Sequence, residues 1–226
     1  MGERVAIVVG AGGELGRATA EKLAAAGFTV VGTDRNEKGL RERPDGIGRE
    51  VADPVDPAAA RNVVDRIAAE VGPPEVLVNT IGTYHLGGAL TATQADLRLM
   101  IDVNVGSALW LTQAVVPYMR ERGSGSIVHV ASRPGLEPTA GLTAYALSKA
   151  ALVYLTRTLD LELRPLGIRV NAVAPQLINT AETRQFTPPD ALAHSVTPGA
   201  IADVLVYLAS DAAAPVSGAI VPAYGG

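Results

Sequence analysis

Three residues with the spacing of an acid–base site lie in the second half of this 226-residue chain. Tyr145 and Lys149 are four positions apart, about one turn of an α-helix, so both side chains project from the same helix face. A phenol with an ordinary pKa near ~10 is a poor base at neutral pH, but an ammonium group beside it favours the phenolate. Ser132, thirteen positions before Tyr145, could polarise a substrate oxygen while Tyr145 exchanges a proton with it. These residues suit interconversion of a carbonyl and an alcohol, provided that another group carries the hydride.

The N-terminal segment has the pattern of a dinucleotide-binding turn. The apolar run 5–9 predicts a buried parallel strand, which leads through a glycine-rich turn into a helix near 14–26. The turn contains four glycines: Gly10, Gly12, Gly13 and Gly16. In this context glycines let a pyrophosphate approach the amides at the helix N-terminus. Asp34 ends the second predicted strand, where a carboxylate can accept both hydroxyls of an adenosine ribose, although Asp is also common as a simple turn residue.

Together the two sites resemble those of the short-chain dehydrogenase/reductase family, and the resemblance extends along nearly the whole chain. The matching motifs occur in the family's order: the glycine turn, Asn79-Thr80-Ile81-Gly82, Asp102-Val103-Asn104-Val105, the strand 126–132 ending at Ser132, the Tyr145 and Lys149 pair, the strand 168–175 followed by Thr180, and 207–211 with the terminal Gly225-Gly226. The resemblance implies an α/β fold, with a Rossmann-type doubly wound parallel sheet of about seven strands flanked by helices on both faces. It also implies an NAD(P)-dependent oxidoreductase that acts on CH–OH groups.

The resemblance assigns a role to each motif. Asn104 joins Ser132, Tyr145 and Lys149 as a catalytic residue, although a plain polar residue inside a helix is its alternative. Lys149 binds the nicotinamide ribose and lowers the pKa of Tyr145. The implied cofactor-binding residues are Gly10, Gly12, Gly13, Leu15, Gly16, Asp34, Arg35, Asp53, Asn79, Gly82, Tyr145, Lys149, Pro175, Ile178 and Thr180. Asp34 favours NAD(H) because a carboxylate repels a 2′-phosphate, while Arg35 leaves NADP(H) possible.

Three positions depart from the family pattern. Glu14 occupies the middle position of the glycine motif, where a carboxylate is unhelpful near a pyrophosphate unless it points to solvent or pairs with Arg17. Pro54 follows Asp53 and has no N–H, so one adenine contact should be missing. Gln176 replaces the usual Gly and could alter the backbone near the nicotinamide amide.

Candidate substrate residues lie beside the motifs. Tyr84 and His85 follow the fourth predicted strand and could line the substrate pocket or lie on the loop surface. Arg133, next to Ser132, could bind an anionic substrate group or form a salt bridge with Glu137.

Strands and helices alternate without an obvious linker, which predicts one domain over 1–226. The predicted strands lie near 4–9, 28–33, 47–51, 75–79, 125–131, 168–173 and 218–222, and the predicted helices near 14–26, 57–71, 95–121, 143–164 and 199–209. The longest irregular piece, 179–198, is the candidate for a short substrate lid. Pro188 and Pro189 leave little room in it for a long helix, which predicts an open pocket.

Composition narrows the classes of function. Hydrophobic residues make up 48% of the chain, but no apolar run approaches the ~18 residues that cross a membrane. The absence of cysteine excludes disulfides and thiol catalysis, and three scattered histidines do not suggest a metal site. A net charge of −4 without a basic cluster argues against nucleic acid as a partner. The composition leads us to expect a cytoplasmic enzyme, and the family resemblance implies a homotetramer or homodimer with a small carbonyl or alcohol as substrate.

Two alternatives to this activity remain open on the sequence. One is a nucleotide-binding sensor or scaffold without turnover, against which the intact Ser132, Tyr145 and Lys149 argue. The other is an isomerase or dehydratase that uses the same bound nucleotide. The identity of the substrate and the direction of the reaction are not encoded in any motif.

Overall fold

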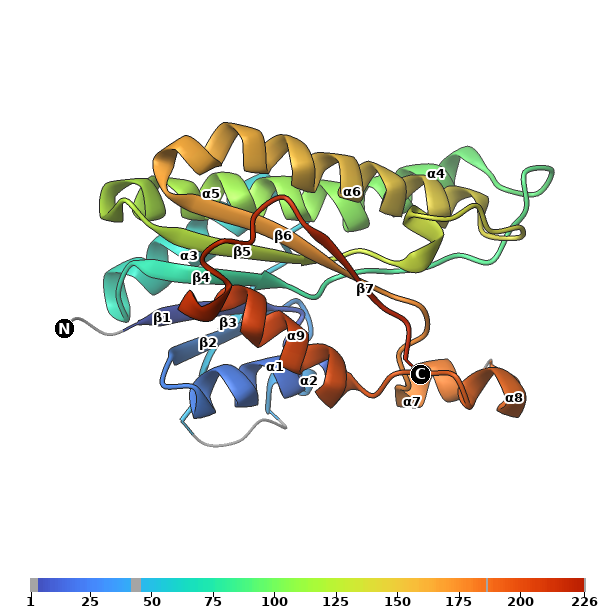
Figure 1. Cartoon of the computed structure of the whole chain (residues 1–226), viewed down its shortest axis with the longest axis horizontal. Coiled ribbons are helices and arrows are strands. Elements are labelled where there is room, and N and C mark those ends of the chain that lie inside the picture. Colours follow the sequence, from blue (N-terminus) through green and yellow to red (C-terminus); the bar gives the residue numbers. More distant parts are fainter. Residues whose placement is uncertain (1–3, 42–45, 186, 226) are drawn as a thin grey trace.

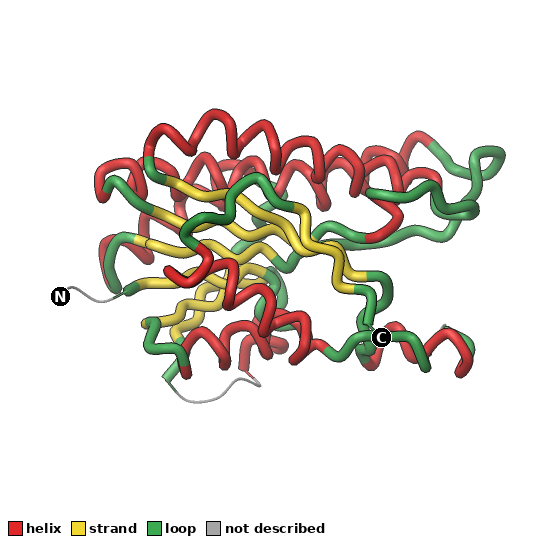
Figure 2. Tube along the Cα trace, in the orientation of Figure 1, coloured by secondary structure: helices red, strands yellow, loops and turns green. Residues whose placement is uncertain are grey.

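The chain folds around a seven-stranded sheet in which every strand pair is parallel (Figure 1 and Figure 2). The structure is a computed structural model that describes residues 4–41, 46–185 and 187–225. The strands are β1 (Val5–Val9), β2 (Thr29–Asp34), β3 (Gly48–Val51), β4 (Pro74–Asn79), β5 (Gly125–Val130), β6 (Ile168–Pro175) and β7 (Ile220–Ala223). Their order is β3-β2-β1-β4-β5-β6-β7, so the winding direction reverses between β1 and β4. The predicted doubly wound sheet is confirmed.

Helices cover both faces of this sheet (Figure 1). The helices are α1 (Glu14–Ala25), α2 (Glu37–Arg41), α3 (Pro57–Glu70), α4 (Gln94–Ile101), α5 (Ser107–Arg122), α6 (Thr143–Leu163), α7 (Ala181–Arg184), α8 (Pro189–Leu192) and α9 (Pro198–Ala209). In one layer α1 packs against α9, and in the other layer α3 packs against α5 while α6 lies on β6. All connections can therefore cross over the sheet in the usual right-handed sense.

The central strand β1 shows why the sheet needs both layers. All five of its residues are buried. Ala6 and Val8 pack into the core under α1 and α9, whereas Val5, Ile7 and Val9 pack into the core under α3 and α5. Because alternate side chains of a strand point to opposite faces, a continuous apolar run is the expected sequence of a strand covered on both sides.

The predicted helix near 95–121 is longer and less regular than expected. Residues 94–122 form one helical stretch, but Asp102–Gly106 makes a π-helical turn (η1) between α4 and α5. By length and composition alone this stretch could cross a membrane, with a mean hydropathy of 1.4 over its most apolar window. Its α5 half instead packs Leu111, Val115 and Met119 into the core beside α3. The π turn shifts the side-chain register along the helix, as is frequent at functional sites.

The segment 179–198 lies beside the carboxyl ends of the strands and holds two short helices, α7 and α8, of four residues each. A bridge between Ile178 and Val196 joins the two ends of the segment. The Thr180 hydroxyl caps α7, and the Glu14 carboxylate accepts a hydrogen bond from the Ala181 N–H at 2.5 Å. This contact ties α7 to the start of α1, and it was not expected from the sequence, which offered solvent or Arg17 for Glu14.

Candidate active site

A cavity of about 970 Å³ opens at the carboxyl ends of the strands, on both sides of the point where the winding reverses. Most of the sequence-predicted residues line it: Gly10, Gly12, Gly13, Leu15, Gly16, Asp34, Arg35, Asp53, Gly82, Tyr84, Ser132, Tyr145, Lys149, Pro175, Ile178 and Thr180. The strand ends therefore bring the glycine turn and the candidate acid–base residues, which lie far apart in the sequence, to one cavity.

Three of the four glycines of the turn, Gly10, Gly12 and Gly16, are packed too tightly for larger residues. Gly10 has φ +82°, a conformation that other residues rarely adopt. A Cβ at Gly16 would clash with the Gly10 carbonyl oxygen, and a Cβ at Gly12 would lie 2.9 Å from an Asp34 carboxylate oxygen. Because the glycines have no side chains, the backbone of the turn is uncovered at the start of α1, and this fits a pyrophosphate held by helix N-terminal amides.

Asp34 is already part of this turn. Its Oδ2 accepts a hydrogen bond from the Gly12 N–H at 3.0 Å, and its Oδ1 accepts one from the Asn36 N–H at 2.9 Å. Each carboxylate oxygen keeps further acceptor capacity on the pocket side. Asp53, also at the pocket, accepts the Val55 N–H at 3.1 Å and so orders the backbone around Pro54. These residues fit the ribose and adenine half of a dinucleotide.

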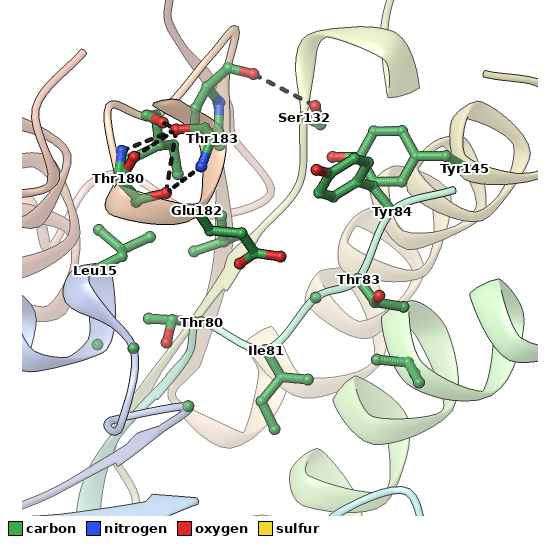
Figure 3. Close-up of a pocket in the computed structure, with 18 of the residues that line it drawn as sticks. Leu15, Thr80, Ile81, Thr83, Tyr84, Ser132, Tyr145, Thr180, Glu182 and Thr183 are labelled. Atoms are coloured by element: carbon green, nitrogen blue, oxygen red, sulfur yellow. Dashed lines mark hydrogen bonds between the residues drawn. The ribbon is translucent and has the colours of Figure 1, made fainter. Parts of the chain in front are cut away.

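Ser132 and Tyr145 lie at the other half of the cavity (Figure 3), and Lys149 lines the same cavity. Ser132 follows β5 and is 5% exposed, while Tyr145 and Lys149 lie in the first two turns of α6. Gly135 makes this approach possible, because a Cβ there would lie 2.7 Å from the Lys149 carbonyl carbon. The Ser132 hydroxyl shares this part of the cavity with Tyr145 and donates to the Pro175 carbonyl oxygen at 3.5 Å. The tertiary structure therefore places a phenol, an alcohol and an amine where the sequence spacing predicted them.

The pKa values of this group differ from the expectation. Burial raises the pKa of Tyr145 above its ordinary value of 10, and the hydrogen bond with Ser132 only opposes that shift. Burial lowers the pKa of Lys149 from 10.5 to about 8. The Lys149 Nζ donates to the Val130 carbonyl at 2.9 Å and lies 5.9 Å from the centre of the Tyr145 ring. The predicted lowering of the Tyr145 pKa by Lys149 is thus not found in the protein alone, because burial of the phenol dominates and Ser132 is the group that opposes it.

Asn104 lies behind the cavity in the π-helical turn and does not line it. Its Nδ2 donates to the Thr83 carbonyl and to the Ser148 Oγ, both at 2.9 Å, and its Oδ1 accepts from the Thr83 N–H at 2.9 Å. Ser148 in turn donates to the Tyr145 carbonyl at 2.8 Å. Asn104 therefore links the loop after β4 to the helix that carries Tyr145 and Lys149.

Gly82 shows how closely these elements approach. A Cβ at Gly82 would lie 3.1 Å from the Lys149 Nζ and 3.3 Å from the Asn104 Oδ1. Below them, His129 of β5 is fully buried, and within the described part of the chain neither of its ring nitrogens has a hydrogen-bond partner. Burial, aided by the Lys149 charge, lowers the pKa of His129 from 6.5 to about 4, so the imidazole is neutral at physiological pH.

Three further predicted residues do not line the cavity. Asn79 is buried at the end of β4, where its Oδ1 accepts the Ile81 N–H at 3.0 Å and shapes the loop behind the site. His85 lies 3.5 Å from the Asp96 carboxylate, outside the cavity wall. Of the candidate pair Tyr84 and His85, Tyr84 alone lines the cavity, and Figure 3 shows its side chain inside it.

Arg133 is the third of them, and its side chain is engaged by neighbouring residues, of which Gln176 lines the cavity. Its Nε donates to Glu137 at 2.8 Å, its Nη1 donates to Gln176 at 2.8 Å, and its guanidinium lies 4.9 Å from the centre of the Tyr224 ring. The salt bridge that the sequence offered as one of two roles is present. Gln176, noted in the sequence only as a departure, is thus a partner of Arg133.

Several lining residues carried no recognisable sequence signal. They are Thr83, Leu86, Leu99, Pro134, Leu142, Leu177, Glu182, Thr183 and Thr187. Leucines such as Leu86 and Leu99 look like ordinary surface or core residues until the loop and α4 are placed in space. Glu182 follows the family's Thr position but is marked by no motif of its own.

Comparison with known proteins gives a consistent result. The profile of the short chain dehydrogenase family matches residues 4–191. The chain is 32% identical over 250 residues to the 4-formylbenzenesulfonate dehydrogenase of Comamonas testosteroni, covering 100% of this chain and 98% of that protein. It is also 32% identical over 235 residues to the 3-oxoacyl-acyl-carrier-protein reductase FabG of Escherichia coli strain K12, covering 99% of this chain and 96% of that protein.

A solved structure has the same fold. The crystal structure titled ribose-5-phosphate isomerase from Brucella melitensis 16M superposes with a TM-score of 0.91 at 31% identity, covering 100% of this chain and 93% of that chain. With the family profile spanning most of the sequence and dehydrogenases matching along its full length, the chain belongs to the short-chain dehydrogenase/reductase family and is an NAD(P)-dependent oxidoreductase.

Proposed function

We propose that the protein interconverts a carbonyl and a secondary alcohol, with Tyr145 as the general acid or base. The observation that carries this proposal is the meeting of Ser132, Tyr145 and Lys149 in the cavity that also contains the glycine turn and Asp34. Nicotinamide chemistry would supply or accept the hydride there. The protein's own residues then have to orient the oxygen of the substrate and move one proton.

The arrangement assigns each residue a step in carbonyl reduction. Ser132 donates a hydrogen bond that orients the substrate oxygen, and Tyr145 delivers the proton to that oxygen as the alcohol forms. Because burial raises the pKa of Tyr145, the phenol is protonated at neutral pH and ready to donate. Lys149 stabilises the phenolate that remains, and Asn104 holds the helix and loop that position the pair. Alcohol oxidation requires the phenolate at the outset, so alkaline pH should favour that direction.

The cofactor we propose is NAD(H). Asp34 lines the cavity next to the glycine turn, and a 2′-phosphate would face its carboxylate. Arg35 also lines the cavity and is exposed, so it is the residue that would pair with the phosphate of NADP(H). We infer that Asp34 decides the preference because its two hydrogen bonds hold the carboxylate in place.

We further propose a homotetramer, with a homodimer as the alternative, in the cytoplasm. Leu147, Tyr154 and Leu161 are spaced by seven positions on α6, so they share one helix face. They are 55%, 76% and 72% exposed, an unusual density of large apolar side chains for a free surface. A two-fold axis brings the same face of two copies together, so we propose a second copy of the chain as the partner of this helix face.

A second candidate activity has one specific observation behind it, the isomerase title of the similar crystal structure. An isomerase would return the hydride to the same molecule, so NAD(P)H would not be consumed. Following the absorbance of NADH with a ketone therefore separates net reduction from isomerisation and from a binding protein without turnover.

Replacing Tyr145 with Phe tests the proposal directly. The variant should bind NADH as the natural protein does, and its kcat should fall by ~10²–10⁴, the range for a lost general acid. Tyr207→Phe is the matched control, because it removes the same hydroxyl from an exposed residue of α9 that does not line the cavity. Turnover by Tyr145→Phe at the rate of the control would refute the assignment.

A further inference from the structure

The wall of the cavity near the catalytic hydroxyls is built from large apolar side chains. It consists of Tyr84, Leu86, Leu99 and Leu142, referred to here as the apolar wall. These residues come from the loop after β4, from α4 and from the residue that precedes α6, and all four line the same cavity as Ser132 and Tyr145. Figure 3 shows the Tyr84 ring inside the cavity with the Tyr145 ring.

The apolar wall is open rather than packed. Tyr84, Leu86 and Leu99 are 38%, 67% and 53% exposed. Single exposed leucines are common, but three large apolar side chains that line one cavity and remain this exposed form an apolar surface open to a ligand. Pockets that bind small molecules are typically lined in this way, with few polar groups that fix the orientation. Tyr84 adds an aromatic face, on which a flat ring stacks favourably.

The charged side chains that line the cavity also favour a substrate without charge. Among the described lining residues the cations are Arg35, which lies at the Asp34 end, and Lys149, which is buried and bonded to Val130. Arg133, which follows Ser132 directly, and His85 do not line the cavity, and each has a carboxylate partner. No described side chain is therefore positioned to neutralise an anionic group on a substrate bound against the apolar wall.

Glu182 adds a negative charge on the opposite side. In Figure 3 its carboxylate points from α7 into the cavity, toward the loop that carries Thr83 and Tyr84. Of the other lining carboxylates, Asp34 and Asp53 belong to the adenosine half, and Glu14 is hydrogen-bonded to Ala181. An anionic substituent in the substrate half would lose water and also face this carboxylate.

We infer that the substrate is an uncharged aryl ketone, or the corresponding alcohol, whose ring stacks on Tyr84 against the apolar wall, and that Glu182 selects against anionic analogues. This inference rests on the proposed function, because the carbonyl has to reach Ser132 and Tyr145. It names Tyr84 and Glu182 as specificity-determining residues, which neither the motifs nor the relatives' names assign.

The test compares kcat/KM for four ketones with NADH: acetophenone, butanone, para-acetylbenzoate and its uncharged methyl ester. The natural protein should prefer acetophenone to butanone by about tenfold or more, since aromatic stacking and the burial of a ring together are worth that much. It should also prefer the methyl ester to the anion by about tenfold or more, because only the anion loses hydration of a charge and faces Glu182. Glu182→Gln should raise kcat/KM for the anion about fivefold and leave the methyl ester within twofold. Tyr84→Ala should reduce the acetophenone value about tenfold and leave butanone within twofold.

Leu90→Ala is the matched control, because Leu90 is a fully exposed apolar residue of the same loop that does not line the cavity. Preference for the anion, or a Tyr84→Ala effect no larger than that of Leu90→Ala, would overturn the inference. A change of molecular mass in Tyr84→Ala without a change in aryl preference would do the same, because it would assign the apolar wall to a second copy of the chain.

The proposed function can fail separately. If no ketone caused NADH to be consumed, the proposed interconversion of a carbonyl and an alcohol would be refuted. The inference would then be decided by calorimetric binding of the same four ketones to the protein saturated with NAD⁺. Equal affinities for para-acetylbenzoate and its methyl ester, or for acetophenone and butanone, would reject it.

Discussion

Lys149→Met should change how the stability of the protein depends on pH, besides abolishing turnover. Lys149 is 3% exposed, and burial lowers its pKa from 10.5 to about 8. At neutral pH the folded protein thus keeps an ammonium group in a place that disfavours its charge. Methionine has a similar length, and it removes the charge together with the proton that titrates.

The magnitude follows from the two pKa values. A difference between 10.5 and about 8 corresponds to ~3 kcal/mol at pH 7, at ~1.4 kcal/mol for each pH unit. Methionine cannot donate to the Val130 carbonyl, and an unsatisfied buried acceptor costs ~1–3 kcal/mol. The two effects oppose one another, so at pH 7 the free energy of unfolding of the variant should lie within ~2 kcal/mol above that of the natural protein.

The pH dependence is the sharper measurement, because the unsatisfied carbonyl does not titrate. Between pH 8 and 10.5 the unfolded lysine binds more protons than the folded one, so the stability of the natural protein rises with pH relative to the variant. Below pH 8 the cost of the buried charge is fully present, and above 10.5 it is absent. Between pH 7 and pH 9.5 the difference in unfolding free energy should shift by ~2 kcal/mol in favour of the natural protein.

The assay is urea unfolding at pH 7, 8 and 9.5, followed by the fluorescence of Trp110, the single tryptophan of the chain, at one fixed protein concentration. Lys38→Met, a change at an exposed lysine of α2, controls for the substitution itself. A stability difference between Lys149→Met and the natural protein that stays constant from pH 7 to 9.5 would refute the depressed pKa of Lys149.

Three further outcomes are expected. Asp34→Ala should reduce the preference for NADH over NADPH, measured as a ratio of kcat/KM, by ~10-fold, and an unchanged ratio would show that another residue sets it. Glu14→Ala should speed the release of bound NADH about fivefold in stopped-flow fluorescence, because the hydrogen bond that holds α7 at Ala181 is worth ~1 kcal/mol. Glu14→Gln keeps an acceptor for the Ala181 N–H and should release NADH at nearly the natural rate. Leu161→Glu should reduce the mass found by light scattering, and a natural protein that is already monomeric would contradict the proposed assembly.

Much of the fold is readable along the chain because its signals are local. The apolar run of β1, the glycines after it and the alternation of strands with amphipathic helices each depend on neighbouring residues, and the predicted seven strands are all present. The pairing of Tyr145 with Lys149 is local too, since four positions on a helix determine a shared face. The meeting of these residues with the glycine turn follows from the rule that parallel strands end at one edge.

Other properties depend on contacts between distant segments, and no local pattern encodes them. The pKa of Tyr145 is set by how much water the folded cavity excludes, so its direction opposes the one inferred from the Lys149 spacing. Arg133 is held by Gln176 and Tyr224, which lie 43 and 91 positions later in the chain. The apolar wall likewise exists only once a loop and two helices are placed around one cavity. The sequence alone therefore determines which chemistry the chain can carry, and the tertiary structure decides the electrostatics and the shape that select its substrate.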